Sequence, residues 1–258
     1  MLKFIFAMGE KGGIGKSTAI LIVLDYLIRT MQTCLLVDTE TSQTPTSTIV
    51  GKKCGLLEQG KLIRVNAANE SALMDLPRIA ERLPEGGTVL VDTGAGSQRL
   101  LLPVLPGILA SIAAMGAQAR IAYLLTAGAE SIQAVRRYLD AVRSCGDSAE
   151  ALQTIFLFAD RTEESPDAYK IMQSVGIRER YPEFATTPRH WVGKLPQVIS
   201  DCISKASLLP STAVDGTGLD IVRRTLLANM RPQLDRLAQV ILGEAEPEMP
   251  ATDEDFLE

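Results

Sequence analysis

The sequence predicts an α/β fold with a mostly parallel central sheet and helices on both faces. Runs that are apolar throughout alternate with amphipathic stretches, and such runs are typical of parallel strands buried on both sides. A glycine-rich segment at residues 9–18, GEKGGIGKST, joins the first apolar run to the first amphipathic stretch. Two later apolar runs end in an aspartate, Asp38 and Asp92. Together these features indicate a sheet whose strand ends carry the chemistry.

Each expected strand corresponds to one apolar run. We place the strands at residues 2–8, 33–39, 61–66, 88–93, 121–127 and 154–160. Amphipathic periodicity predicts helices between most of them, at residues 16–31, 70–83 and 130–145. A closing amphipathic helix is expected at residues 219–242, with a kink at Pro232.

One stretch has the length of a membrane span. Residues 100–119 carry no charge, and about 20 apolar residues are enough to cross a bilayer. However, Pro103, Pro106 and Gly107 are expected to break the first half of this stretch. We therefore predict a buried helix or a helix–helix interface here, and not a membrane span.

Composition and charge narrow the possible functions. The chain has 258 residues, of which 46% are hydrophobic and 22% are charged, and its net charge is −5. This charge argues against a surface that binds nucleic acid everywhere, but it is compatible with a local basic patch. We expect one folded domain at residues 1–243 and an acidic, proline-containing, disordered tail at residues 244–258.

The cysteines and the N-terminal residues indicate a compartment. The four cysteines are scattered, without a C-x-x-C pair or a histidine at ligand spacing. This pattern predicts small core residues in a reducing compartment, and not a metal site or disulfides. The first residues lack a charged region followed by a cleavable apolar segment. The expected location is the cytoplasm, including association with the nucleoid.

The glycine-rich segment has the composition of a phosphate-binding loop. Its four glycines allow the backbone to wrap a phosphate with the N–H groups pointing inward. The loop leads into the positive N-terminal end of a helix that begins near Lys16. The Lys16 ammonium group would reach the β- and γ-phosphates of a nucleotide, and the Ser17 hydroxyl would hold Mg²⁺.

An additional lysine inside the glycines points to a particular family. Residues 11–17, KGGIGKS, match the signature K-G-G-x-G-K-[ST] of the ParA/MinD family of deviant Walker-A ATPases. The chain resembles a short ParA-like member without an N-terminal helix-turn-helix. This resemblance implies a P-loop NTPase fold and an ATP-sandwich homodimer, in which Lys11 neutralises phosphate charge on the partner's nucleotide. From the residues alone, the alternative is a solvated loop lysine.

Two further segments are similar to the acidic motifs of this family. The run LVDTETSQ resembles D-x-D-P-Q, which implies that Asp38 lies near the metal and that Glu40 positions the attacking water. Glu40 is one methylene longer than the family's aspartate, and Ser42 replaces the usual proline, which bears on hydrolysis more than on nucleotide binding. The run VLVDTGAG is similar to the Walker-B and switch II region, where Asp92 would polarise a Mg²⁺-bound water. The resemblance thus implies catalytic roles for Lys11, Lys16, Asp38 and Glu40, and metal ligation by Ser17, Asp38 and Asp92.

The base-contacting residues match the family less sharply. Asp160 stands where the family has an asparagine that contacts adenine, and the sequence has no N-K-x-D guanine reader, which favours ATP. The family's later proline aligns with Pro196, with a rival alignment around Pro188. The resemblance implies that the nucleotide is contacted by Gly12, Gly13, Ile14, Gly15, Lys16, Ser17, Thr18, Asp160 and Pro196.

The resemblance implies a slow, partner-stimulated ATPase that acts in DNA or plasmid partition or positions a macromolecular complex. The expected partners are a second copy of the chain, nonspecific DNA, and a centromere-binding or conjugation protein. The acidic end of the chain is unlike a basic membrane-binding helix, so no membrane partner is expected. Two alternatives stay open: an accessory switch of conjugation or another polar machine with little turnover, and a small-molecule kinase or ligase.

DNA contacts in such a protein would come from basic residues of the dimer. Taken singly, each basic residue is also compatible with a solvated surface charge. The candidates are Arg178, Arg180, Arg189, Lys194, Lys205, Arg223, Arg224 and Arg231. His190 and Trp191, the single histidine and tryptophan, are expected to take packed or rim positions.

Overall fold

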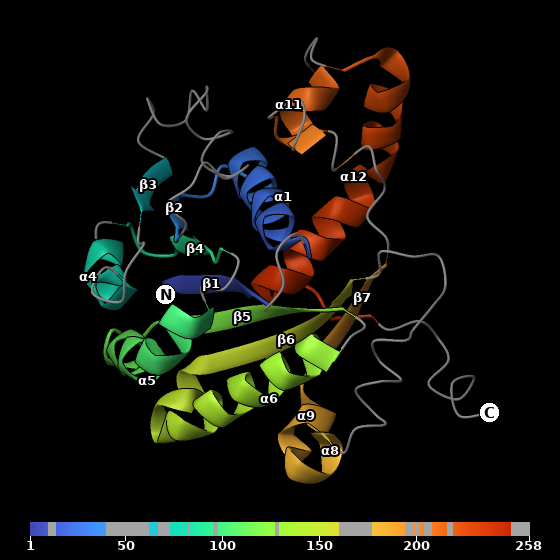
Figure 1. The fold of residues 1–258 in the computed structure, drawn as a ribbon. Helices are drawn as coiled ribbons and strands as arrows, with labels where there is room; N and C mark the ends of the chain where they lie inside the picture. Colours follow the sequence, from blue (N-terminus) through green and yellow to red (C-terminus); the bar gives the residue numbers. More distant parts are fainter. Residues whose placement is uncertain are drawn as a thin grey trace, which may run out of the picture.

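A computed structural model describes most of the chain and contains one parallel sheet. The described residues are 1–9, 14–39, 62–66, 73–81, 83–94, 98–126, 129–159, 177–193, 199, 202–203, 208–215 and 219–248. Within them, seven strands form the order β3-β2-β4-β1-β5-β6-β7, and every neighbouring pair is parallel (Figure 1). The strands are β1 (Lys3–Met8), β2 (Cys34–Asp38), β3 (Leu62–Asn66), β4 (Thr88–Asp92), β5 (Gln118–Leu125), β6 (Leu152–Ala159) and β7 (Arg189–Gly193).

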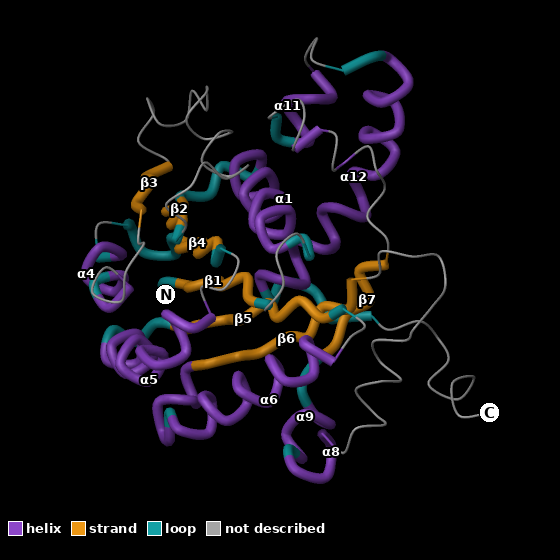
Figure 2. Tube along the Cα trace, in the orientation of Figure 1, coloured by secondary structure: helices purple, strands orange, loops and turns teal. Residues whose placement is uncertain are grey.

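Helices cover both faces of this sheet, which confirms the predicted α/β architecture (Figures 1 and 2). One face carries α1 (Lys16–Arg29), α11 (Pro210–Asp215) and α12 (Ile221–Leu242). The other carries α4 (Leu76–Ala80), α5 (Gln98–Ala114), α6 (Ala129–Ser144), α8 (Ile177–Arg180) and α9 (Pro182–Thr186). A short 3-10 helix, η1 (Gly146–Ala151), leads into β6.

Successive side chains of each strand point to opposite faces of the sheet, and this divides the core into two layers. In β1, Phe4 and Phe6 pack with the α5 and α6 layer, whereas Ile5 and Ala7 pack with the α1 and α12 layer. Each of these four side chains is at most 1% exposed. Because successive side chains of a strand point to opposite faces, an apolar run without polar interruptions fills both layers.

The uncharged stretch at residues 100–119 forms a core helix and the start of a strand. Helix α5 runs from Gln98 to Ala114 with Pro103 and Pro106 inside it, so the prediction that these prolines break the helix is wrong. The reason is a buried stripe at helical spacing, in which Leu101, Leu105, Ile108 and Ile112 are each at most 1% exposed. Among the described residues, no helix combines the length and apolarity needed to cross a membrane.

Other element boundaries also differ from the prediction. The helix expected at residues 70–83 contains α4 (Leu76–Ala80), and residues 70–72 and 82 of this range lie outside the described part. The strand β5 begins at Gln118, before the predicted start, and β7 was not predicted. Helix α12 continues through Pro232 to Leu242.

The first residues of the predicted acidic tail contact the body of the fold. Lys3 Nζ lies 3.6 Å from Glu244 Oε1, and Arg236 forms an ion pair with Glu248. The backbone N–H of Glu248 also donates to His190 Nδ1 at 3.0 Å. Residues 249–258 lie outside the described part, so the prediction of disorder there stays a prediction.

Candidate functional site

The predicted phosphate-binding loop leaves the carboxyl end of β1 at a residue that must be glycine. Gly9 has a φ of +149°, and a Cβ atom there would lie 2.9 Å from the Leu124 carbonyl oxygen and 2.3 Å from Ile14 Cδ1. Gly15, which precedes α1, also has a positive φ of +104°. Both glycines therefore adopt backbone conformations that other residues rarely take, one just after the buried strand and one just before the helix.

Helix α1 presents an N-terminus suited to an anion. Its N-cap is Gly15, which offers no side-chain hydrogen bond, and its first turn contains no acidic residue. The first N–H groups of a helix have no partner inside the helix and carry partial positive charge. Lys16, the first helical residue, is only 5% exposed. Ser17 and Thr18 follow it in half-buried positions.

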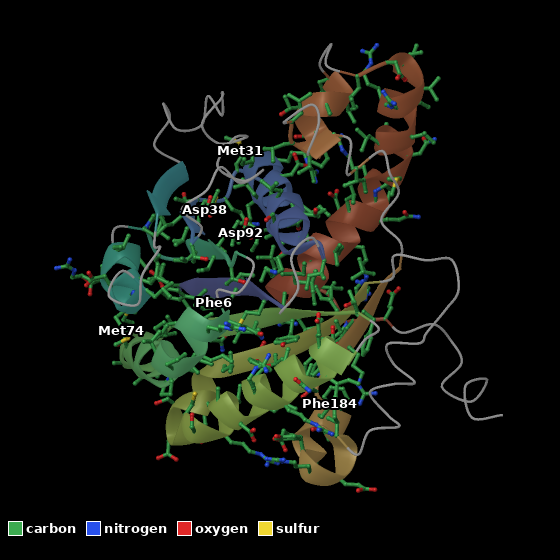
Figure 3. All side chains as sticks on the ribbon, in the orientation of Figure 1. Phe6, Met31, Asp38, Met74, Asp92 and Phe184 are labelled. Atoms are coloured by element: carbon green, nitrogen blue, oxygen red, sulfur yellow. The ribbon has the colours of Figure 1, made fainter. Side chains whose placement is uncertain are left out.

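The two predicted metal-binding acids lie side by side on neighbouring strands. Asp38 at the end of β2 is in direct register with Asp92 at the end of β4, and Asp92 is in register with Ala7 of β1. The aspartates are 1% and 2% exposed. Strand alternation directs both toward the layer that contains α1, and Figure 3 shows them close together beside this helix. We call Lys16, Asp38 and Asp92 the carboxyl-edge cluster.

This donor set fits a hard divalent cation. Carboxylate and hydroxyl oxygens are the ligands that Mg²⁺ prefers, and buried charges need a partner or a metal. The carboxyl-edge cluster combines two buried carboxylates with one buried ammonium group. The cluster therefore has the charge to accept a cation together with an anionic ligand.

Two threonines, each directly after one of the acids, bond to the backbone at the ends of neighbouring strands. The Thr39 hydroxyl donates to the Asp92 carbonyl oxygen at 3.1 Å and accepts a hydrogen bond from the Gly94 N–H at 3.1 Å. The Thr93 hydroxyl donates to the Ala7 carbonyl oxygen. Sequence reasoning did not identify this pair. The signal was the repeated Val-Asp-Thr at the ends of two expected strands.

The described residues include only part of the predicted site. The structure places Ile14, Gly15, Lys16, Ser17, Thr18, Asp38 and Asp92 at the carboxyl edge of the sheet. The predictions for Lys11, Gly12, Gly13, Glu40, Asp160 and Pro196 lie outside the described residues.

The basic residues considered for DNA binding occupy both layers. Arg180 of α8 lies 3.8 Å from Asp140 and stacks on Tyr181 in one layer. Arg223 lies 3.3 Å from Asp220 at the start of α12 in the other layer. Arg189 Nη2 donates to the Phe184 carbonyl oxygen at 3.1 Å. Of the remaining candidates, Arg224 and Arg231 belong to α12, whereas the side chains of Arg178, Lys194 and Lys205 are outside the described part.

Residues expected to be packed are buried where the structure describes them. His190 is 8% exposed, and burial is the main cause that lowers its pKa. Cys34, Cys145 and Cys202 are buried free thiols, and burial raises the pKa of Cys202 to about 12. These positions confirm structural roles, whereas Cys54 and the Trp191 side chain lie outside the described part. In that part, no group of three histidine, cysteine or acidic side chains could hold a metal.

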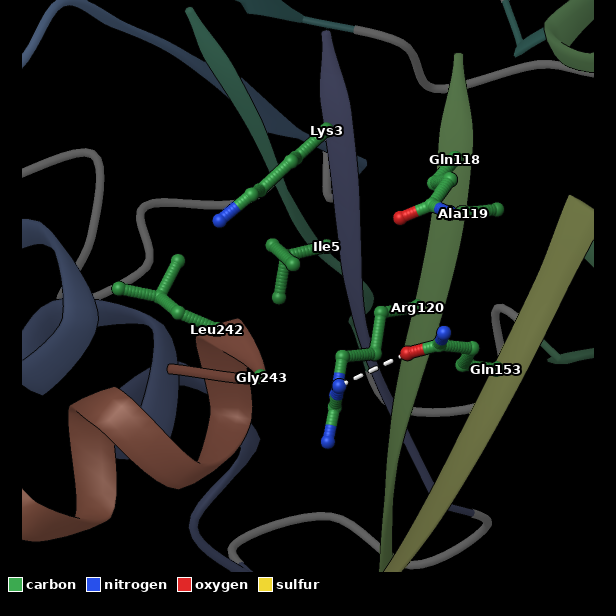
Figure 4. A pocket seen from close by; sticks show the side chains of 8 residues that line it. All are labelled: Lys3, Ile5, Gln118, Ala119, Arg120, Gln153, Leu242 and Gly243. Atoms are coloured by element: carbon green, nitrogen blue, oxygen red, sulfur yellow. Dashed lines mark hydrogen bonds between the residues drawn. The ribbon is translucent and has the colours of Figure 1, made fainter. Parts of the chain in front are cut away.

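A small pocket lies at the opposite edge of the sheet, where the strands begin, and its lining residues connect neighbouring elements of the fold. Its volume is about 130 Å³, and Figure 4 shows its lining of Lys3, Ile5, Gln118, Ala119, Arg120, Gln153, Leu242 and Gly243. Arg120 Nη1 donates to Gln153 Oε1 at 2.9 Å, and Lys3 lies 3.6 Å from Glu244. Lys3 thus ties the sheet to the chain just after α12, Arg120 links β5 to β6, and both place positive charge near the C-terminal end of α12, where a helix dipole favours it.

Comparisons with solved structures agree with the fold described above. No family model and no curated protein matches the chain. Apo McdA of Cyanothece matches with a TM-score of 0.57 and 13% identity, over 95% of this chain and 99% of that chain. The septum site-determining protein MinD of Pyrococcus horikoshii, complexed with Mg-ADP, matches with a TM-score of 0.54 and 14% identity, over 93% and 99%.

A synthase is similar to the same extent. Cobyrinic acid a,c-diamide synthase of Mycobacterium smegmatis, with bound ADP and magnesium, matches with a TM-score of 0.52 and 15% identity, over 97% of this chain and 100% of that chain. The chain thus shares its fold with deviant Walker-A ATPases over nearly its full length, which confirms the structural part of the predicted resemblance. At these identities the likeness concerns the fold, and function must be argued from the site.

Proposed function

We propose that the protein is a Mg²⁺-dependent ATPase that forms a homodimer around ATP and acts in DNA or plasmid partition or in positioning a macromolecular complex. The observation that carries this proposal is the carboxyl-edge cluster. Lys16 is the first residue of α1, whose N-cap is a glycine, and Asp38 and Asp92 are paired in register on the adjoining strands. A lysine, a helix N-terminus and two carboxylates are the groups that a magnesium–nucleotide complex needs.

Nucleotide binding is assigned to the loop after β1 and the first turn of α1. The N–H groups of that turn would donate to phosphate oxygens, and the Lys16 ammonium group would neutralise terminal phosphate charge. Because Lys16 is only 5% exposed, its attraction for phosphate is screened less than it would be in water. Ser17 and the two aspartates would hold Mg²⁺, and the bound ion would add positive charge next to the phosphates. Complexes of similar structures with Mg-ADP support the choice of ligand.

Hydrolysis and dimerisation are assigned to two residues of the family motifs. Glu40 would orient the attacking water, because its carboxylate can accept a hydrogen bond from that water. Lys11 would neutralise phosphate charge on the partner's nucleotide, so that two ATP molecules can face one another across the dimer. The glutamate at position 40 and the serine at position 42 are consistent with slow turnover that a partner stimulates.

Two alternatives are separated by what happens to the γ-phosphate. An accessory switch of conjugation or another polar machine would bind ATP and dimerise with negligible turnover, for which Glu40 and Ser42 are the argument. A small-molecule kinase or ligase would transfer the phosphoryl group to an acceptor other than water. The similarity of the fold to that of a synthase is the argument for this alternative.

Phosphate release tests the proposal. The wild-type protein should release phosphate from Mg-ATP without any added small molecule, and DNA or a partner protein should increase the rate. Glu40→Ala should keep ATP affinity and lose most of this hydrolysis, because the water is no longer oriented. ATP-dependent DNA binding should weaken with salt as counterions are released. Tight ATP binding without phosphate release would favour the switch, and release only with an added acceptor would favour the kinase or ligase.

A further inference from the structure

The residues at the ends of β2 and β4 are joined by a backbone hydrogen bond and by one hydroxyl group, both from Thr39. Thr39 is 6% exposed and follows Asp38 directly. Its backbone N–H and its hydroxyl both lie 3.1 Å from the Asp92 carbonyl oxygen, and the Gly94 N–H donates to its hydroxyl at 3.1 Å. A single side chain therefore contacts the backbone on both sides of Thr93.

The chemistry of this contact requires a hydroxyl. A threonine hydroxyl has one proton to donate and two lone pairs to accept, so it can donate to Asp92 and accept from Gly94 at the same time. Valine has the same shape but can do neither. Thr39 and Asp92 are both buried, so the bond between them is shielded from water.

The bonds hold the backbone that carries the two carboxylates of the carboxyl-edge cluster. Asp38 and Asp92 are in register, and Thr39 binds the backbone of Asp92 and the residue two positions beyond it. Sheet pairing alone fixes the strands, which end at Asp38 and Asp92. The backbone N–H of Thr39 continues this pairing to the Asp92 carbonyl oxygen, and the hydroxyl extends the connection to Gly94, two residues beyond the end of β4.

We propose that Thr39 is a positioning residue that sets the relative placement of the Asp38 and Asp92 carboxylates for a divalent cation. The inference deepens the proposed function and rests on it. Groups that orient metal ligands typically affect metal affinity or activity by about 10–100-fold when they are removed. Thr39→Val should therefore weaken divalent-cation binding in this range, and Thr39→Ser should stay within about 3-fold of wild type because it keeps the hydroxyl.

Mn²⁺ binding measures this effect without turnover. A slowly hydrolysed ATP analogue is mixed with an equimolar amount of Mn²⁺ and this complex is titrated into the protein, while the electron paramagnetic resonance signal of Mn²⁺ reports how much of the metal is bound. Wild type, Thr39→Val and Thr39→Ser are compared, and Thr39→Ala replaces the valine variant if that variant does not fold. Thr154→Val is the control, because its hydroxyl interacts with Tyr138 near the start of β6 and away from the carboxyl edge.

The outcomes separate this inference from the proposed function. Weaker Mn²⁺ binding in Thr39→Val, recovery in Thr39→Ser and no change in Thr154→Val support the positioning role. Lower thermal stability of Thr39→Val with wild-type Mn²⁺ affinity would overturn it and leave the proposed function intact. Equal loss in the serine and valine variants would also overturn it. A wild-type protein that binds neither the analogue nor Mn²⁺ would remove the proposed function, and this inference with it.

Discussion

Gly9→Ala should destabilise the protein strongly, because the substitution adds both backbone strain and a steric clash. At a φ of +149°, a residue with a Cβ atom pays about 1–3 kcal/mol of backbone strain. The new Cβ would lie 2.9 Å from the Leu124 carbonyl oxygen, well below the ~3.5 Å of an ordinary contact. The side chain of Ile14 can rotate away, but the carbonyl oxygen belongs to the backbone of β5. Such overpacking adds about 1–3 kcal/mol, so the expected total is about 2–6 kcal/mol.

Urea unfolding measures this loss, and Gly116→Ala is the matched control. Gly116 also has a positive φ, of +63°, but no atom lies within 4 Å of its virtual Cβ. The control should cost about 1–2 kcal/mol, from the left-handed conformation alone. Both variants should lower the urea midpoint with an unchanged m-value. If Gly9→Ala is no more destabilising than Gly116→Ala, the close approach of β5 to the loop does not constrain this residue.

Two further predictions concern the dimer and pH. Lys11→Ala should leave ATP binding to the monomer nearly intact but abolish dimerisation with a slowly hydrolysed ATP analogue; light scattering tests this, and normal dimerisation would make Lys11 an ordinary loop lysine. Burial, and to a lesser degree Arg236, lowers the pKa of His190, whereas Glu248 opposes the shift. The stability from His190 should therefore be fully present above its unfolded pKa of about 6.5 and be lost as pH falls through the lowered folded pKa. The urea midpoint should then fall less between pH 7.5 and 5 in His190→Gln than in wild type, and identical pH profiles would contradict this reasoning.

The main features of the sheet could be predicted because burial on both faces leaves a simple pattern. Phe4, Ile5 and Phe6 are apolar in succession since each fills one of the two layers. Strand β7 gives no such signal. It contains Arg189 and His190, pairs only with β6 at the edge of the sheet and has an irregular register near its end. Its position is set by tertiary pairing and not by local composition.

Helix α5 shows why local rules failed in one place. Each interior proline removes a backbone donor, which predicted a break at Pro103 and Pro106. The helix persists because Leu101, Leu105 and Ile108 are buried against the sheet, and this packing outweighs the lost hydrogen bonds.

The candidate site was predictable where a motif fixes residue type and spacing. Lys16, Asp38 and Asp92 were identified because they stand in the loop motif and the two acidic motifs, and the structure places them at the carboxyl ends of neighbouring strands and at the helix start that follows. The sequence did not predict the contacts of Thr39, because these contacts depend on which two strands are neighbours in the sheet. The expected strands gave no strand order, and β2 and β4 are neighbours although β3 lies between them in the sequence.

The central claim is that the carboxyl-edge cluster binds a magnesium–nucleotide complex. Calorimetric titration of the wild-type protein and of Lys16→Ala with ATP, with and without Mg²⁺, tests it most directly. The account predicts that the wild-type protein binds ATP in a Mg²⁺-dependent way and that Lys16→Ala loses this binding. Among the described residues, Lys16 is the buried cation at the start of α1, so its removal leaves no lysine there to neutralise the phosphates. Near-normal ATP affinity in Lys16→Ala, or a wild-type protein that does not bind ATP, would contradict it.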